Sequence, residues 1–272
     1  MDSRKKADGT KKAASGISIL EGAIGKNLIK FASPIAASSI LQQLFNSADT
    51  AVVGHFTDTT ALAAVGTNAE IVGFLVTMSS GTAVGLNVLL SWKIGEKRSP
   101  EQIRRTMHTG FLMAFLIGIL LMAAGFFLAA PVLHLMHAPK AAYSQAVLYL
   151  RIYSLGLPLL MVYDFVCAAE RARGNSLRPL WALICSGILN VLLNLTFVIV
   201  FRLGVAGVAI ATDLSNGASV FLTLRWLSRD SDPGFRFRFS ELCLDRGIVK
   251  TVLRIGVPAA LQGAVFCIAN LF

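Results

Sequence analysis

Residues 28–49 read LIKFASPIAASSILQQLFNSAD, and residues 252–272 read VLRIGVPAALQGAVFCIANLF. The two segments align when Pro34 is placed on Pro258, and most of the residues between them fall in apolar stretches. An internal repeat of membrane helices is typical of secondary transporters, whose substrate site lies where the repeats meet. Because the second copy begins only just before the last residue, we expect the chain to be half of a two-lobe protein.

The composition supports a membrane protein. Hydrophobic residues make up 55% of the chain, charged residues 15%, and the mean hydropathy is +0.66. A typical soluble domain carries about 25% charged residues. This chain therefore has too few charges to cover a water-facing surface of its size, which predicts an integral membrane protein surrounded by lipid.

Apolar stretches of about 20 residues can cross a bilayer as helices. The sequence has six of them and the start of a seventh, at 28–56, 61–92, 106–130, 146–168, 178–201, 204–226 and 249–272. The predicted fold is all-α: a six-helix transmembrane lobe plus the beginning of a seventh helix. The corresponding domains are a cytoplasmic tail (1–27), a lobe (28–228), an inter-lobe loop (229–248) and the first helix of a second lobe (249–272).

The distribution of Lys and Arg predicts the orientation. The alternate sides of the predicted spans carry 22 and 3 of the 25 basic residues. By the positive-inside rule the N-terminus is cytoplasmic, in a cell inner or plasma membrane. The net charge of +10 follows from this topology. The Arg/Phe alternation in 235–239 resembles a nucleic-acid patch, but a loop at the anionic leaflet explains it better, so we expect lipid and no nucleic acid as its partner.

Acidic residues inside apolar spans are costly and mark candidate functional positions. Asp49 lies roughly 31 Å from the inner end of the first span, and Glu70 and Asp213 lie roughly 14 Å from the outer ends of theirs. These three fall at similar depths in the middle to outer part of the bundle. Glu70 has a second interpretation, because its side chain could reach the outer interface. Asp164 lies nearer the cytoplasmic end, where it could pair with Arg171 or Arg173.

Amide side chains accompany the acids. Asn46 and Asp49 are three residues apart and share a helix face, as do Asn190 and Asn194, which are four apart. A buried carboxyl among amides suits reversible protonation, and its oxygens could also hold Na⁺. We therefore expect H⁺ or Na⁺ as the ligand, with no other cofactor or metal. The alternative is that each Asn simply bonds a neighbouring helix.

Other residues in the spans have less specific interpretations. Pro34 removes a helix hydrogen bond and could form either a movable kink that gates the site or a static bend. Gly81-x-x-x-Gly85 and Gly204-x-x-Gly207 predict close helix packing. The chain contains no HExxH, GxSxG, Walker A or CxxC motif and no nucleophile–base pair, so an enzyme is not expected.

Several motifs together are similar to those of the multidrug and toxic compound extrusion (MATE) transporters, bacterial NorM/DinF-like branch. They cover about residues 28–272, and their order and spacing carry the resemblance. The segments are Pro34 with Phe45–Thr50, Ala61–Gly66, Gly95–Arg98, Arg171–Ser176, Gly187–Asn194 and Gly204–Thr212.

The resemblance implies half of a 12-helix, two-lobe transporter that exports cationic or amphipathic small molecules, such as drugs, in exchange for H⁺ or Na⁺. Asp49 matches the family's cation-coupling carboxylate, and Asn190 and Asn194 match its polar pair. Some members carry Asp at the position of Asn194. Asp213 stands where an apolar residue is expected. The absent C-terminal lobe would be the partner of this one.

Two other functions compete with this one. A lipid-linked glycan flippase of related architecture would favour basic residues inside the spans, whereas these spans carry acids. A non-transporting gene fragment would need a second copy to cover its exposed lobe face.

Overall fold

The computed structural model describes residues 24–269, so the predicted tail 1–27 lies almost wholly outside the described residues. Within them the chain is helical, without strands. The α-helices are α1 (Ile24–Phe56), α2 (Thr59–Gly95), α3 (Pro100–Leu135), α4 (Tyr143–Leu155), α5 (Leu157–Ala172), α6 (Leu177–Leu195), α7 (Val205–Ser228) and α8 (Arg246–Ala269). A π-helix, η1 (Thr196–Val200), extends α6, and a 3₁₀ turn, η2 (Phe239–Glu241), precedes α8.

Among the described residues, five helices are long and apolar enough to cross a membrane: α2, α3, α6 with η1, α7 and α8. The α4–α5 pair makes six if it counts as one broken span. The predicted all-helical membrane fold is thus confirmed. The first predicted span, now α1, is a 33-residue helix but is not among the five. Polar residues such as Gln42, Gln43 and Asp49 lower its hydropathy.

The predicted span 146–168 is two helices and not one. The axes of α4 and α5 differ by 48° across Gly156. Pro158 follows at the start of α5. Proline cannot donate the next backbone hydrogen bond and disfavours helical geometry in the residue before it, so α4 ends here.

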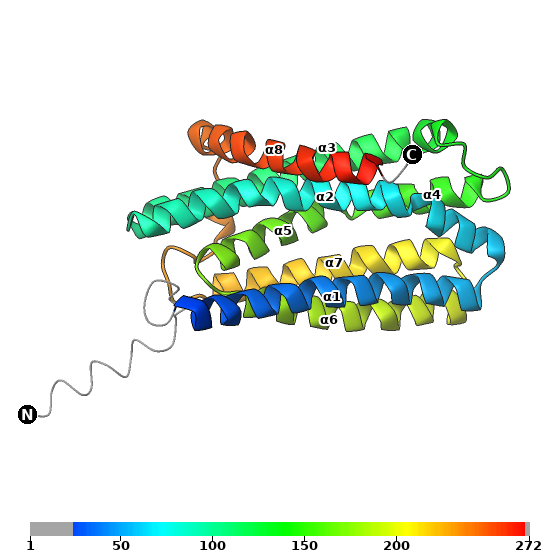
Figure 1. Cartoon of the computed structure of the whole chain (residues 1–272), viewed down its shortest axis with the longest axis horizontal. Coiled ribbons are helices and arrows are strands. Elements are labelled where there is room, and N and C mark those ends of the chain that lie inside the picture. The colour runs from blue at the N-terminus through cyan, green and yellow to red at the C-terminus, as the bar shows by residue number, and fades with distance from the viewer. Residues whose placement is uncertain (1–23, 270–272) are drawn as a thin grey trace, which may run out of the picture.

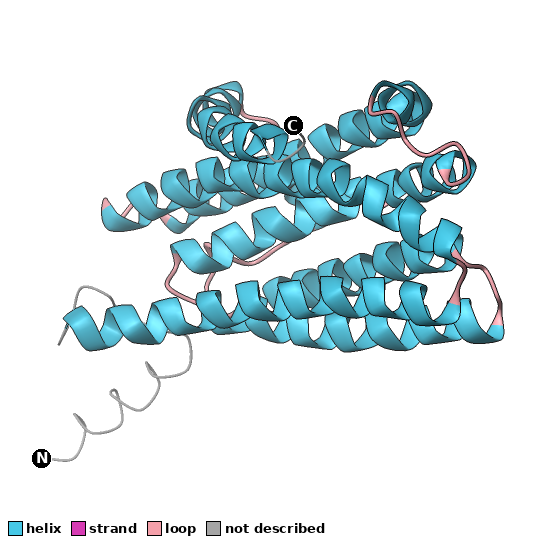
Figure 2. Ribbon diagram, turned by 45° about the vertical axis from the view of Figure 1, so that its right-hand side comes forward, coloured by secondary structure: helices cyan, strands magenta, loops and turns pink. Residues whose placement is uncertain are grey.

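The helices form a bundle in which α2 lies between two groups. Figure 1 shows α8 and α3 on one side of α2, and α1, α6 and α7 on the other. Figure 2 shows the same separation after rotation. Apolar side chains fill the bundle in two clusters, one around Phe165 and Leu227 and one around Leu133 and Val198.

Glycines let α8 approach α2 closely. A Cβ at Gly81 would fall on the backbone of Ala260, and one at Gly85 on the backbone of Val252. Gly256 meets the backbone of α2 in the same way. Small residues permit this backbone proximity in membrane helices. The structure confirms that the Gly81-x-x-x-Gly85 motif packs, and its partner is the helix that repeats α1.

The segment predicted as an inter-lobe loop is packed onto the lobe. Phe235 and Phe237 are buried, whereas Arg236 and Arg238 between and after them are exposed. The ring of Phe237 stacks on buried His108 of α3 at 5.3 Å. Alternating side chains of an extended backbone point in opposite directions, which explains the Arg/Phe pattern.

Candidate functional site

The structure joins three of the predicted site residues. Asn194 on α6 donates through Nδ2 to Oδ1 of Asp49 on α1, at 2.5 Å. The same nitrogen lies 3.3 Å from Oδ1 of Asn190, one turn earlier on α6. Asn190 and Asn194 are buried, and Asp49 is partly buried. A carboxyl group on α1 is therefore hydrogen-bonded by an amide of α6, and the two asparagines share one face of that helix.

A fourth member of this chain of hydrogen bonds was not predicted. Asn190 donates through Nδ2 to Oγ1 of Thr212 on α7, at 3.4 Å. Thr212 in turn donates to the carbonyl of Val208 at 3.0 Å. The sequence signal for Thr212 was its position beside Asp213 in an apolar helix. A Thr that hydrogen-bonds a backbone carbonyl of its own helix is too common for this signal to be specific.

Close packing between α1 and α6 sets this geometry. A Cβ at Gly187 would fall on the ring of Phe45, so this ring lies against the α6 backbone in the space that the glycine leaves free. One turn further along α1 lies Asp49, and two turns further along α6 lies Asn194. The glycine thus brings the carboxyl and amide groups within hydrogen-bond reach.

The network contains an unused acceptor. Oδ1 of Asn194 is buried and has no hydrogen-bond partner among the described residues. A buried acceptor without a partner is costly. A proton on Asp49 could reach such an oxygen, and a hard cation could be held by it together with the carboxylate. The π-helix η1 begins two residues later, and π-helical turns are frequent at functional sites.

Asp213 lies apart from the network, at the break between α4 and α5. Its carboxyl occupies the space that a side chain at Gly156 would fill, and its buried Oδ1 has no hydrogen-bond partner in the part of the chain that the structure describes. The stacked rings of Tyr149 and Tyr153, 6.2 Å apart, lie within electrostatic range of both Asp213 and Asp49. The two carboxyls therefore line the same interior region on different helices.

The remaining predicted residues are not joined to the network. Asn46 is exposed on α1, and Glu70 is half-buried on α2 without an ion pair or side-chain hydrogen bond among the described residues. Pro34 is buried inside α1, which continues as a helix through it. Ser38 donates to the Pro34 carbonyl at 2.8 Å.

Asp164 does not form the predicted ion pair with Arg171 or Arg173. It accepts a hydrogen bond from Ser79 of α2 at 2.5 Å. Arg173 instead binds Glu170 and Asp230, at 2.6 and 2.8 Å. Glu170 lies one turn from Arg173 and is 2% exposed, so the guanidinium has a nearer partner than Asp164.

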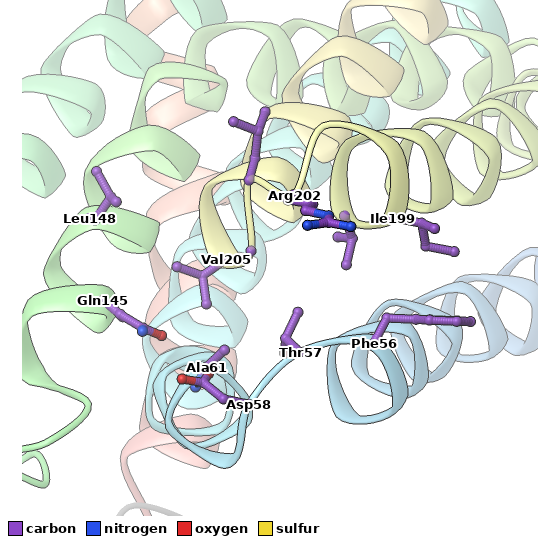
Figure 3. A pocket seen from close by; sticks show the side chains of 12 residues that line it. Phe56, Thr57, Asp58, Ala61, Gln145, Leu148, Ile199, Arg202 and Val205 are labelled. Carbon is purple, nitrogen blue, oxygen red and sulfur yellow. The ribbon is translucent and has the colours of Figure 1, made fainter.

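A pocket of about 570 Å³ opens beyond the network, at the end of the bundle that holds the α1–α2 turn. Figure 3 shows side chains from α1, α2, α4 and the η1–α7 turn around it, including Gln145 and Arg202. Oε1 of Gln145 is buried without a partner. The pocket shares α1 and α7 with the network, so it is a candidate vestibule to Asp49. Among the described residues, no three His, Cys, Asp or Glu side chains are arranged to hold a metal ion.

Comparison with known proteins identifies related chains. The MatE family profile matches residues 34–196. The chain is 29% identical over 249 residues to the probable multidrug resistance protein YpnP of Bacillus subtilis, covering 89% of this chain and 54% of that protein. It is 26% identical over 261 residues to the probable multidrug resistance protein NorM of Thermotoga maritima, covering 89% and 52%.

Solved structures share the fold. A multidrug resistance MATE family transporter of the MOP superfamily, in an outward-facing conformation, superposes with a TM-score of 0.86 at 23% identity. The match covers 95% of this chain and 57% of that one. The chain thus spans about half the length of the relatives it matches.

Proposed function

Because the chain belongs to the MatE family, we propose that it forms the N-terminal lobe of a cation-coupled antiporter that exports cationic or amphipathic small molecules. The hydrogen-bonded chain Asp49–Asn194–Asn190–Thr212 supports this proposal most directly. The names of the two relatives, both probable multidrug resistance proteins, favour drug-like substrates. A second lobe, equivalent to the half of the relatives that this chain does not cover, completes the pathway.

In this proposal Asp49 binds the coupling ion, either H⁺ or Na⁺. A carboxylate inside a membrane protein is costly while it is charged and without a cation, so ion binding relieves that cost. Asn190 and Asn194 complete the site, and the free Oδ1 of Asn194 offers the additional acceptor. Asp213 provides a second carboxyl on α7, at the α4–α5 break and not in contact with the network, and Asn46 and Glu70 have a weaker role.

Ion binding then changes the position of α1. Asn194 holds Asp49 through a single short hydrogen bond, so a proton or Na⁺ on the carboxylate alters the contact between α1 and α6. Pro34 supplies the point at which α1 can bend, because the Lys30 carbonyl lacks its usual backbone donor. Movement of α1 displaces substrate from the lobe, and rocking of the two lobes gives alternating access.

The chain is a multi-pass membrane protein, and we propose that its N-terminus is cytoplasmic. The support is the concentration of 22 of 25 basic residues on one side of the predicted spans. With this orientation, the vestibule beside Arg202 faces outside, where the coupling ion enters.

The test is Asp49→Asn in the protein that includes its second lobe. A pH gradient or a Na⁺ gradient would be imposed separately on everted vesicles. Efflux of a cationic dye would then be followed by fluorescence. We expect the variant to lose gradient-driven efflux while its amount in the membrane is unchanged. Glu101→Gln, an exposed acid at the start of α3, is the matched control and should transport normally. Unchanged efflux in the Asp49 variant would refute the assignment.

A further inference from the structure

A second polar pocket lies at the opposite end of the molecule from the vestibule. It has a volume of about 550 Å³ and lies among the end of α2, the start of α3 and the start of α8. Figure 1 shows the start of α8 at the same end of the bundle as the end of α2. Three basic residues line it, Lys93, Arg98 and Arg105, together with Trp92. The antiport site is not part of this pocket.

The charges in this pocket do not cancel. Arg98 pairs with Glu96 at 2.8 Å, and Arg105 pairs with Asp245 at 2.9 Å. Lys93 has no ion pair among the described residues; its Nζ donates to Oγ1 of Thr106 at 2.7 Å. The pocket therefore has one positive charge in excess, and its ammonium group has hydrogen-bonding capacity left for an anion.

The surroundings of the pocket match a membrane surface. Trp92 is 57% exposed at the last turns of α2. Tryptophan is enriched at the level of lipid headgroups, where its ring lies in the apolar layer and its N–H in the polar one. In the proposed orientation this end of the bundle faces the inside of the cell, where the leaflet is anionic.

We propose that this pocket binds the phosphate group of an anionic phospholipid from the inner leaflet. Lys93 supplies the central contact. The exposed side chains of Arg98 and Arg105 turn toward the phosphate, and Trp92 lies beside the acyl chains. Basic pockets between membrane helices on the cytoplasmic side are suited to such headgroups. The proposal depends on the orientation of the chain and not on the transport function.

A lipid in this position bridges the first lobe and α8. Asp245 accepts hydrogen bonds from the backbone of Gly247 and Ile248, so it caps α8 while it also pairs with Arg105. A phosphate that binds Lys93 and Arg105 thus reaches the start of the helix that repeats α1. It would hold that helix against α2 at its inner end.

Binding can be measured with the purified 272-residue chain in dodecyl maltoside by native mass spectrometry. The probes are dioctanoyl phosphatidylglycerol, dioctanoyl phosphatidylcholine and inorganic phosphate. We expect phosphatidylglycerol to bind, with an affinity that falls as salt is added. The Lys93→Gln/Arg98→Gln/Arg105→Gln variant should bind it much more weakly, by about fivefold per cation removed.

The matched control removes the same charge elsewhere at the inner end. Arg225→Gln/Arg229→Gln/Arg236→Gln changes three exposed residues outside the pocket and should bind as the unchanged chain does. A second variant guards against misfolding as the cause of lost binding. In Glu96→Gln/Asp245→Asn the opposing carboxylates are replaced by neutral amides, so binding should tighten several-fold. Asn can still cap α8, so the fold should be kept.

Three results would overturn the proposal. Equal loss in the two triple variants would show that charge alone attracts the lipid to the surface. Equal binding of phosphatidylcholine would show that the pocket does not select an anionic headgroup. If inorganic phosphate bound as tightly as phosphatidylglycerol, the site would belong to a free anion and not to a lipid.

Discussion

Asn194 donates a hydrogen bond to the Asp49 carboxylate at 2.5 Å, although 145 residues separate them in the sequence. This contact ties α6 to α1, with Asn194 fully buried and Asp49 partly buried. A buried acceptor that loses its donor bears the full cost of its own desolvation. The pair is therefore important to stability as well as to the proposed ion site.

The first prediction concerns this pair. Asn194→Leu removes the donor and should lower stability by about 1–3 kcal/mol, because the partly buried Asp49 loses its hydrogen-bond partner. Thermal unfolding in detergent, followed by tryptophan fluorescence, measures the change. In Asp49→Leu/Asn194→Leu both polar groups are gone, and we expect most of the loss to be recovered. Additive losses in the double variant would mean that the two residues are not coupled.

Replacing a glycine at the α2–α8 contact by a larger residue should push the two helices apart. A Cβ at Gly85 meets the backbone of Val252, which cannot move as a side chain can. Overpacking of this kind costs about 1–3 kcal/mol, so Gly85→Ala should lower the melting temperature. Gly73→Ala on the same helix is the control, since a Cβ there meets nothing within 4 Å. Alanine favours a helix over glycine, so the control should be neutral or stabilising.

The cluster of Glu170, Arg173, Arg178 and Asp230 should make stability depend on pH. Burial alone would raise the pKa of Asp230, but hydrogen bonds from the Asp232 backbone and from Arg178 and Arg173 outweigh it and hold the pKa below its ordinary value of 3.8. Asp230 therefore stabilises the fold fully above about pH 4, and this contribution is lost as pH falls through the lowered pKa.

Asp230→Asn tests this dependence. The difference in melting temperature between the unchanged chain and the variant should be constant from pH 7 to 5 and should shrink toward pH 3. Asp232→Asn, which changes a neighbouring acid without an ion pair among the described residues, should not show that dependence. A difference in melting temperature that stayed the same down to pH 3 would contradict the prediction.

How far the sequence predicts this structure varies with the kind of feature. Hydropathy and basic residues predict the long helices, because each helix depends on local composition. The spacing of Asn190 and Asn194 predicts their shared face for the same reason. Thr212 could not be found, since its contact depends on how α7 packs against α6. The break at Gly156 was missed because hydropathy does not distinguish a straight helix from a bent one, although Pro158 was a signal for the bend.

Long-range partners were the least predictable features. Asp164 was expected to bind Arg171 or Arg173 from their proximity in sequence, yet its partner Ser79 lies on another helix. The Arg/Phe alternation was interpreted as a loop at the anionic leaflet, and the structure shows its phenylalanines buried against the lobe. The burial of Phe235 and Phe237 could not be predicted, because it depends on distant partners: Phe237 stacks on His108 of α3, and Phe235 lies under the Arg173 guanidinium.

The last prediction concerns how His108 holds the segment before α8. Its Nδ1–H donates to the Arg104 carbonyl at 2.8 Å, so Nε2 carries no proton and accepts from the Arg238 backbone N–H at 3.0 Å. His108→Ala removes this acceptor and the ring on which Phe237 stacks. The segment should then leave the lobe more often, and trypsin should cleave after Arg236 and Arg238 faster.

A loss of about 1–3 kcal/mol for the buried hydrogen bond corresponds to an increase in cleavage rate of roughly fivefold to 100-fold. The rate is measured by mass spectrometry of the fragments under native conditions, where cleavage follows the population of the open segment. His134→Ala, at the other end of α3, removes a histidine without contact to this segment and should leave the rate unchanged. Equal rates in the two variants would show that apolar burial of Phe235 and Phe237 holds the segment without help from His108.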